Sequence, residues 1–361
     1  MKAGGPSQER IRVNDLHAFC VEAMLSCGMR QEDARVTADV LVTTDTWGVH
    51  THGTKHLGTY LARARAGGID PRAVPQVASE GPGWAMIDAR KAMAMVAAHR
   101  AMSVAIEKAR ACGIGYAGVK QSTHFGAAGY YANMAAEKGM IGISMSNVDT
   151  NMNAPGASGG VIGNNPFAYA VPSGSGHPIL LDIAMSTVAA GKVVAAKERG
   201  EPIPDTWLVD ANGKPSTNPS DYPNVATLLP MAGHKGYGLA VMVEVLAAVL
   251  TGSAMTRDIK SWALDLDLVT DEGHAFIAID IGAMMPPDLF ARRLDRMTGG
   301  IRNAPKAGGA DRIYLPGEKE WEKRDAALRD GIILPADVVA ALVKMGEELR
   351  VHPPAFMKAP A

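Results

Sequence analysis

A change of hydrophobic periodicity along the chain constrains the fold more than any single motif. Both ends of the 361-residue sequence show the spacing of amphipathic helices, whereas the middle alternates short apolar runs with helical ones. Strands are predicted at residues 84–89, 114–119, 140–146, 167–172, 179–184 and 275–281, and helices at 92–111, 127–138, 287–297 and after Lys235. This alternation is typical of an α/β fold.

The two ends of the chain are predicted to be helical. The first 70 residues contain one helix capped by Asn14 or Asp15 and ending at Gly28, a second over residues 31–44, and a third from Thr54 to Gly67. Residues 321–349 are again mostly helical in pattern. We therefore predict a helical domain formed by residues 1–75 with 290–361, and an α/β domain over residues 76–289.

Charge and composition exclude several classes of partner. The 36 Lys plus Arg residues nearly balance the 37 Asp plus Glu residues, so the chain lacks the strongly basic character of proteins that bind phosphate backbones. The longest strongly apolar stretch, residues 238–250, contains Glu244 and is too short to span a bilayer, so we expect a buried helix there. The N-terminus has no apolar segment typical of a signal peptide, and the three cysteines show no CxxC spacing. These features predict a cytoplasmic protein that binds neither nucleic acid nor membrane.

Two motifs match known signatures by letter but not by context. Gly113-Ile-Gly115-Tyr-Ala-Gly118 fits GxGxxG, yet a predicted helix precedes it and a predicted strand follows it. The dinucleotide fingerprint needs the strand first and the helix second, so Gly113 is more simply a helix C-cap. Residues 156–160 fit GxSxG but follow a polar segment instead of a hydrophobic strand, and we interpret them as a loop.

Three of the ten histidines, His50, His52 and His56, fall within seven residues. If a helix begins near Thr54, its dipole disfavours a charged His52, and a neutral imidazole suits general acid/base catalysis. The same spacings occur in metal sites, so a metal-dependent hydrolase using these three histidines is an alternative. Histidines without a catalytic role also fit the pattern.

Polar residues at predicted strand ends indicate a second set of functional positions. His124 lies between a strand and an apolar helix, where α/β folds bind ligands, although a buried structural histidine fits equally. Residues 147–165, rich in Asn and Gly, predict a long ligand-lining loop. Asp182 ends an apolar strand, where it could orient a histidine, accept a cofactor hydroxyl or cap a helix. Lys235, at a helix start beside glycines, either meets an anion or stays solvated.

Six motifs, in the same order, resemble the malate/L-lactate dehydrogenase type-2 family over nearly the whole chain. They are Thr51-His52-Gly53 followed by Tyr60, Arg63 and Gly67-Gly68; Ser122-Thr-His124-Phe-Gly-Ala-Ala-Gly; Gly163-Asn-Asn165-Pro166; Leu181-Asp182-Ile-Ala with Ser186; Pro230-Met-Ala-Gly-His234-Lys235; and Leu315-Pro-Gly317-Glu318. The resemblance implies a non-Rossmann NAD(P)-binding domain with a mixed, largely antiparallel sheet over residues 76–289. It also implies that the helical ends form a substrate and dimerisation domain, and that the protein is a homodimer.

The resemblance assigns roles to individual residues. His52 and His124 match the histidines given proton-transfer roles. From its position we add Asp182, which would orient an imidazole or bind the cofactor, as the third predicted catalytic residue. Thr51, His56 and Tyr60 are predicted to bind the substrate. The predicted cofactor-binding residues are Val148, Asp182, Ile183, Ala184, His234, Lys235, Gly317 and Glu318.

Two positions depart from the family pattern. Thr51 stands where Ser is usual and keeps a hydroxyl, whereas His56 stands where many members have an Arg that could bind a carboxylate in two-pronged fashion. The sequence predicts an oxidoreductase that transfers a hydride between NAD or NADP and a small 2-hydroxy or 2-oxo acid, or a related ureido or cyclic imino acid. The metal-dependent hydrolase and a ligand-binding protein that has lost its chemistry are the alternatives; no metal site is predicted for the oxidoreductase.

Overall fold

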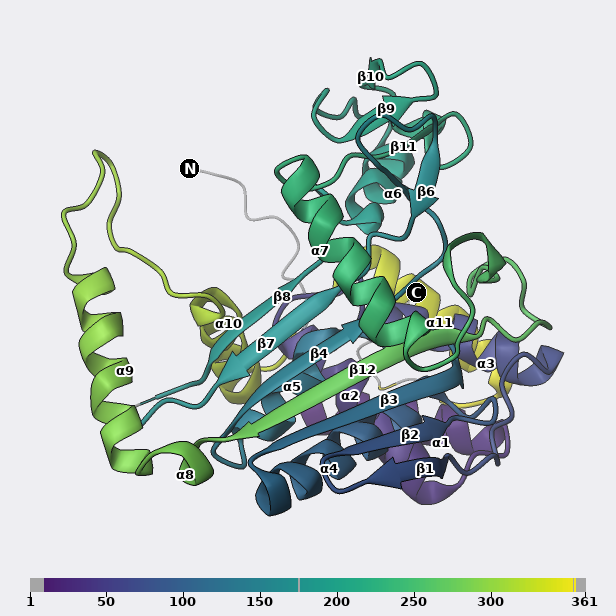
Figure 1. The fold of residues 1–361 in the computed structure, drawn as a ribbon. Coiled ribbons are helices and arrows are strands. Elements are labelled where there is room, and N and C mark those ends of the chain that lie inside the picture. The colour runs from purple at the N-terminus through teal and green to yellow at the C-terminus, as the bar shows by residue number, and fades with distance from the viewer. Residues whose placement is uncertain (1–9, 175, 353, 355–361) are drawn as a thin grey trace, which may run out of the picture.

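The computed structural model describes residues 10–174, 176–352 and 354 and is built around a seven-stranded sheet (Figure 1). The strand order is β1-β2-β3-β12-β4-β7-β8, and only the β2–β3 pair is parallel. The strands are β1 (Gln76–Gly81), β2 (Trp84–Asp88), β3 (Ile114–Ser122), β4 (Met140–Ser146), β7 (Phe167–Val171), β8 (Ile179–Ile183) and β12 (Glu272–Asp280). The predicted α/β class with a mixed, largely antiparallel sheet is confirmed.

Helices cover both faces of this sheet. Along β12, Phe276 and Ala278 face the core shared with α4 (Ala94–Cys112) and α5 (Ala128–Ala136), because successive side chains of a strand point to opposite faces. Ala275 and Ile277 face the other side, which is covered by α7 (His234–Glu244) and its continuation as a π-helix, η3 (Val245–Val249). Each face is therefore buried by a different part of the chain.

The GxGxxG match lies where α4 passes into β3, in the order that the sequence predicts. Gly113 follows the last residue of α4 with a positive φ of 84°, and β3 begins at Ile114. Positive φ is readily adopted by glycine, so Gly113 ends the helix and cannot place a helix N-terminus over a phosphate. The rejection of a Rossmann fingerprint is confirmed.

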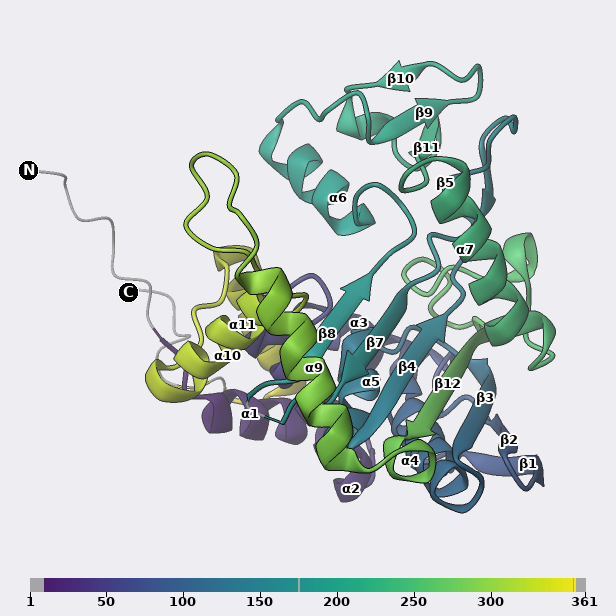
Figure 2. The same cartoon turned by 60° about the vertical axis from the view of Figure 1, so that its left-hand side comes forward.

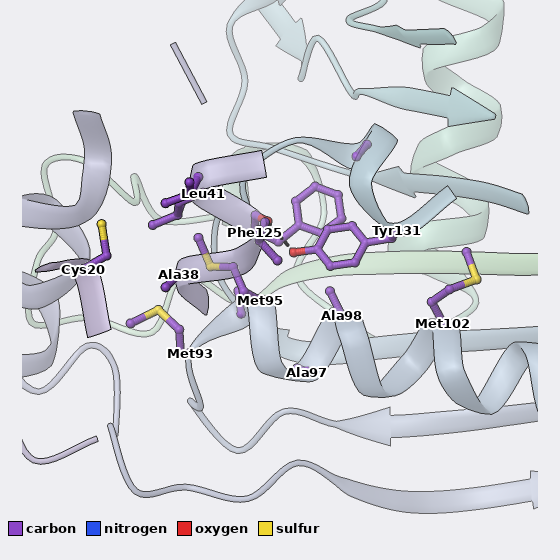
Figure 3. Packing of buried hydrophobic residues seen from close by; sticks show 14 of the residues in the cluster. Cys20, Ala38, Leu41, Met93, Met95, Ala97, Ala98, Met102, Phe125 and Tyr131 are labelled. Carbon is purple, nitrogen blue, oxygen red and sulfur yellow. Dashed lines mark hydrogen bonds between the residues drawn. The ribbon is translucent and has the colours of Figure 1, made fainter. Parts of the chain in front are cut away.

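The two ends of the chain pack together against the α4 and α5 side of the sheet (Figure 2). Their helices are α1 (Val13–Ser26), α2 (Gln31–Thr46), η1 (Thr54–His56), α3 (Leu57–Ala66), α10 (Glu318–Asp330) and α11 (Ala336–Leu349). A β-bridge joins Ile11 to Ile332, and a continuous core runs from Leu41 in α2 to Ala98 in α4 and Phe125 (Figure 3). The helical ends and the sheet thus share one hydrophobic core.

The predicted helices at the ends are present, but the predicted first cap is wrong. Arg12 precedes α1 without a side-chain hydrogen bond, and Asn14 and Asp15 lie inside the helix. The start of α1 is instead fixed by the bridge from Ile11 to the C-terminal part of the chain. Tertiary contact has replaced the local cap.

A second, smaller sheet was not predicted. Its order is β10-β9-β11-β5-β6, and with α6 it builds a separate core around Met152, Val193 and Leu208 (Figure 1). The elements are β5 (Met152–Asn153), β6 (Gly160–Ile162), α6 (Ala190–Arg199), β9 (Leu208–Asp210), β10 (Pro215–Ser216), η2 (Pro219–Asp221) and β11 (Ala226–Leu228). Strands of two or three residues are too short to show a periodicity. The segment 147–165, predicted as one loop, contains two of them.

Residues 238–250 are helical as predicted, but the expectation of a buried helix is wrong. Leu239, Met242 and Val249 are 51%, 55% and 55% exposed, because only the opposite side of α7 and η3 packs on the sheet. The remaining helices are η4 (Thr256–Asp258), α8 (Ile281–Met284) and the projecting α9 (Pro287–Arg302; Figure 1). No helix in the described part of the chain has the length and apolar character needed to cross a membrane.

Candidate active site

The histidine-rich segment 50–56 is organised by a buried carboxylate, Asp45, which is 1% exposed at the end of α2. One oxygen lies 2.8 Å from Nδ1 of His50, and the other accepts the N–H (2.9 Å) and hydroxyl (2.6 Å) of Thr54. A Cβ on Gly53 would lie 2.2 Å from the same carboxylate, so only glycine fits. Asp45 therefore fixes the ring of His50 and the turn at Thr54 together.

Five rings from three segments form what we call the ring cluster: His52, His56, Tyr60, His124 and Trp262. The His52 and His124 ring centroids are 5.6 Å apart. Trp262 stacks on His124 at 4.3 Å with 15° between the planes, and meets His56 edge-on at 4.9 Å. The ring cluster brings together both predicted catalytic histidines and two predicted substrate residues, with Thr51 alongside: Oγ1 of Thr51 lies 3.0 Å from Nδ1 of His52.

Burial keeps the histidines of the ring cluster uncharged. It lowers the pKa of His52, and it lowers the pKa of His124 well below its usual range, with further lowering from His52 and His56. The sequence predicted a neutral His52 from the helix dipole; the direction is the same, but desolvation is the cause. The Tyr60 hydroxyl lies 2.5 Å from Nδ1 of His124, and burial raises the pKa of Tyr60 well above its usual range. Tyr60 therefore keeps its proton, and its hydroxyl can donate a hydrogen bond to Nδ1 of His124.

Trp262 was not predicted, and it is placed by a buried arginine. The guanidinium of Arg63, which is fully buried in α3, donates to the carbonyls of Trp262 (2.9 Å), Asp265 (2.9 Å) and Leu268 (2.7 Å), and to Oγ1 of Thr270 (2.8 Å). We call this set of bonds the Arg63 clasp. It ties the 262–270 segment, which has no regular secondary structure, against the ring cluster.

Asp182 lies near the end of β8, and its oxygen Oδ2 accepts the N–H of Gly129 at 2.7 Å. Gly129 is in the first turn of α5, so Asp182 caps a helix that begins more than fifty residues earlier in the chain. A Cβ on Gly129 would lie 3.0 Å from that oxygen. Asp182 is partly exposed, yet desolvation raises its pKa to about 6. The hydrogen bond from Gly129 acts in the opposite direction and lowers that pKa. Its carboxyl makes no hydrogen bond to a histidine among the described residues, so the cap is the role that the contacts support.

The segments predicted to bind a cofactor converge on β8 and the residues after it. The N–H of Leu180 bonds to Pro316, beside Gly317 and Glu318, at 3.1 Å. Met185, just after Ala184, bonds through its carbonyl to the N–H of Met231 at 2.8 Å, near His234 and Lys235. Its own N–H bonds to Asn164 at 2.8 Å, and the neighbouring Asn165 accepts the N–H of Val148 at 3.2 Å. Segments from four parts of the chain thus border one region.

The residues in this region fit a dinucleotide. His234 and Lys235 are exposed at the N-terminus of α7, and Lys235 has no ion-pair partner in the described part of the chain, which suits an anionic pyrophosphate. Glu318 lines a cavity of about 200 Å³ between the start of β8, α9 and α10. There it pairs with Arg302 at 2.5 Å and Arg312 at 3.5 Å. The cavity offers both donors and acceptors to a ligand that carries hydroxyl and phosphate groups.

Two buried acids in β12 and α7 were also missed. Glu244 accepts from the side chains of Asn147 (3.3 Å) and Asn165 (2.8 Å), and so anchors the loop that contains Val148. Glu272 is 1% exposed, and neither oxygen has a hydrogen-bond partner among the residues that the structure describes. Burial, then the charge of Asp149, raises the pKa of Glu272 well above its usual range. Acidic residues are usually exposed, so a sequence pattern gives no signal for either burial.

Comparison with known proteins agrees with this arrangement. The family model described as malate/L-lactate dehydrogenase matches residues 11–343. Malate dehydrogenase of Pyrococcus abyssi is 35% identical over 349 residues, covering 95% of each chain. Ureidoglycolate dehydrogenase (NAD(+)) of Escherichia coli O157:H7 is 33% identical and covers 92% of this chain and 95% of that protein. The structure of malate dehydrogenase from Pyrococcus horikoshii OT3 superposes with a TM-score of 0.88 at 32% identity, over 98% of this chain and 99% of that chain.

The family match and the relatives identify an oxidoreductase that uses a nicotinamide cofactor, NAD or NADP; relatives include both NAD(+)- and NADP(+)-dependent dehydrogenases. The chain belongs to the malate/L-lactate dehydrogenase family. The resemblance drawn from the six motifs is confirmed. The metal-dependent hydrolase loses its geometric basis, since the described residues contain no group of three His, Cys, Asp or Glu side chains that could hold a metal ion.

Proposed function

We propose that the enzyme interconverts a small 2-hydroxy acid and its 2-oxo acid, or a ureido or cyclic imino relative, with His124 as the principal acid/base. Its similarity to malate, sulfolactate and ureidoglycolate dehydrogenases and to a delta1-piperideine-2-carboxylate reductase supports this range of substrates. The observation that carries the assignment is the hydrogen bond of 2.5 Å between Tyr60 and Nδ1 of His124.

In this proposal the hydroxyl of Tyr60 is the donor in that bond. Because Tyr60 donates to Nδ1, the neutral imidazole carries its proton on Nε2, the nitrogen left to serve the substrate oxygen. In the reductive direction Nε2–H donates to the carbonyl oxygen; in the oxidative direction Nε2 accepts the hydroxyl proton. His52, with its ring centroid 5.6 Å from that of His124, is proposed to share the substrate oxygen or relay its proton.

The remaining predicted residues hold the reactants. Nicotinamide, when bound, supplies or accepts the hydride at C4. Ile183, Ala184, Val148 and Asp182 are proposed to border that ring, with Asp182 fixing the start of α5 below it. His234 and Lys235 are proposed to meet the pyrophosphate, and Gly317 and Glu318 the far end of the cofactor. Thr51, His56 and Tyr60 shape the substrate end.

Absorbance at the nicotinamide band tests the proposal. Purified protein is mixed with NADH or NADPH and a panel of 2-oxo acids and cyclic imines, and thermal shift reports cofactor binding separately. We expect oxidation of one cofactor with at least one substrate, and a loss of about 100-fold or more in kcat for His124→Ala. Near-normal turnover by that variant would refute the role of His124. A cofactor shift without turnover of any substrate would favour the ligand-binding alternative.

We also propose a cytoplasmic homodimer, divided into a helical substrate and dimerisation domain (1–75 with 290–361) and an NAD(P)-binding domain (76–289). The exposed apolar side chains of α7 and η3, which belong to the NAD(P)-binding domain, form a stripe that suits an additional contact with a second copy of the chain, since monomers rarely expose such patches. The three cysteines, Cys20, Cys27 and Cys112, are unpaired, as expected in a reducing compartment. Light scattering should give twice the chain mass of 37.9 kDa, and Met242→Glu should lower it.

A further inference from the structure

The charge state of the ring cluster indicates which class of substrate the enzyme accepts. This inference rests on the proposed function. The ring of His56 lies between two fixed partners. Its Nε2 donates to the carbonyl of Thr51 at 2.8 Å, and its ring meets Trp262 edge-on at 4.9 Å. Because a carbonyl can only accept, the proton of the neutral ring is on Nε2 and is already used. His56 therefore presents an uncharged aromatic edge to the substrate end.

The burial of His56 keeps it uncharged near neutral pH. Desolvation, with smaller contributions from His52 and Lys55, lowers the pKa of His56 to about 4, and the bond to Thr51 only partly opposes this. The same desolvation acts on His52 and His124. None of the three imidazoles in the ring cluster supplies a positive charge to an anion.

The cations on neighbouring positions face other partners. Lys55 reaches Asp337 in α11 at 2.7 Å. Arg63 is held in its clasp by three carbonyls and a hydroxyl, and Arg65 lies 3.8 Å from Glu348. The cationic side chains of η1 and α3 are thus turned away from the rings or committed to backbone oxygens.

Two groups lie behind the ring cluster: the carboxyl of Glu272, whose raised pKa favours its neutral form, and the guanidinium of Arg63, whose charge partly opposes that rise. Glu272, at the start of β12, is close enough to Tyr60 for its charge to act on the tyrosine hydroxyl, and Asp149 acts on Glu272 in turn. An additional carboxylate placed against the rings would meet neutral imidazoles, while Lys55, Arg63 and Arg65 already have other partners. A buried anion without a partner is strongly disfavoured.

We propose that the substrate presents an uncharged apolar or cyclic group to His56 and Trp262, and that the enzyme discriminates against dicarboxylates. The flat face of Trp262 is already stacked on His124, so a planar or aliphatic substituent extends the same aromatic packing. The carboxylate next to the reacting carbon then lies on the side of the substrate away from His56 and Trp262.

A substrate panel at pH 7 tests this inference. We measure kcat/KM for 4-methyl-2-oxopentanoate, phenylpyruvate and Δ1-piperideine-2-carboxylate against oxaloacetate, each with NADH and NADPH. We expect the best uncharged-substituent substrate to exceed oxaloacetate by about tenfold or more, the factor that 1.4 kcal/mol gives. Equal or better use of oxaloacetate by the wild-type enzyme overturns the inference and leaves the proposed function intact. Failure of every substrate overturns the proposed function, and this inference with it.

A matched pair of variants isolates the wall formed by His56. His56→Arg adds a cation there and should raise the oxaloacetate preference by about tenfold. His56→Gln keeps an uncharged donor for the Thr51 carbonyl, so it should retain the wild-type order of substrates. If His56→Arg and His56→Gln rank the substrates in the same order, the charge at residue 56 does not set specificity and the inference fails. If His56→Arg does not fold, the wild-type panel decides the question.

Discussion

Replacing Arg63 with Met should loosen the wall of the active site and destabilise the protein. The variant keeps the length of an unbranched side chain but removes the four hydrogen bonds of the Arg63 clasp. A hydrogen bond from a charged group contributes about 1.5–3 kcal/mol. Each acceptor left without a donor costs about 1–3 kcal/mol unless it turns to water. The carbonyls of residues 262–270 belong to an irregular segment that can move outward, so we expect about 3–5 kcal/mol in total.

Urea unfolding and hydrogen exchange measure the two consequences separately. The free energy of unfolding reports the loss of stability, and backbone exchange over residues 262–270 reports release of the segment that carries Trp262. A rise in KM should accompany the release. Arg65→Met is the matched control: its guanidinium, on the same helix, lies 3.8 Å from Glu348 and is 47% exposed, so it should change stability by less than about 0.5 kcal/mol.

A defined set of results would refute the claim that the Arg63 clasp holds residues 262–270 in place. If Arg63→Met stays within about 1 kcal/mol of the wild type, with unchanged exchange over residues 262–270, the four hydrogen bonds do not hold the segment. Arg63→Lys provides a graded test, because it keeps the charge but lacks the planar fork that reaches several acceptors at once. We expect it to fall between the wild type and Arg63→Met.

Three further predictions concern buried or crowded groups. Glu272→Gln should gain stability relative to the wild type as pH rises from 5 to 8, as measured by urea midpoints. The reason is that the pKa of Glu272 is raised in the folded state, so the wild type loses stability as pH rises through that pKa. Parallel pH curves of the two proteins would contradict this prediction. Gly53→Ala should lower the free energy of unfolding by about 2 kcal/mol or more, since its Cβ meets Asp45. The control Gly58→Ala, whose Cβ has its nearest contact at 3.9 Å, should be tolerated. Equal thermal melts of the two variants would exclude the clash. Asp182→Asn should remove an inflection near pH 6 from kcat/KM, matching the pKa of about 6, and persistence of the inflection would assign it elsewhere.

The sequence predicted the large sheet because its strands are apolar runs of five to nine residues, apart from the polar β1. The smaller sheet was missed because its strands are two or three residues long and are defined by pairing with distant segments. The same limit explains the wrong prediction for residues 238–250. An apolar stretch indicates a helix, but whether its second face is covered depends on what lies opposite in space.

For the site, local patterns located residues and long-range contacts gave them their environment. His52 and His124 stand out by clustering and by position at strand ends. Trp262 has no local signal, because its place depends on Arg63, which is about 200 residues away in sequence. The partner of Asp182 is likewise Gly129, 53 residues earlier. These pairings follow from packing of the chain ends on the sheet, which periodicity alone does not specify.

One physical cause links the chemistry of the site to its selectivity. The chain ends carry His52, His56 and Tyr60 against the sheet that carries His124, and the Arg63 clasp closes Trp262 over them. Burial by these elements lowers the pKa of every imidazole in the ring cluster, so the acid/base groups work as neutral donors and acceptors. The same burial makes the site unfavourable to a second carboxylate, because no imidazolium is present to receive it. A variant that admits water or a cation at His56 should therefore change substrate preference and the pH dependence of proton transfer together.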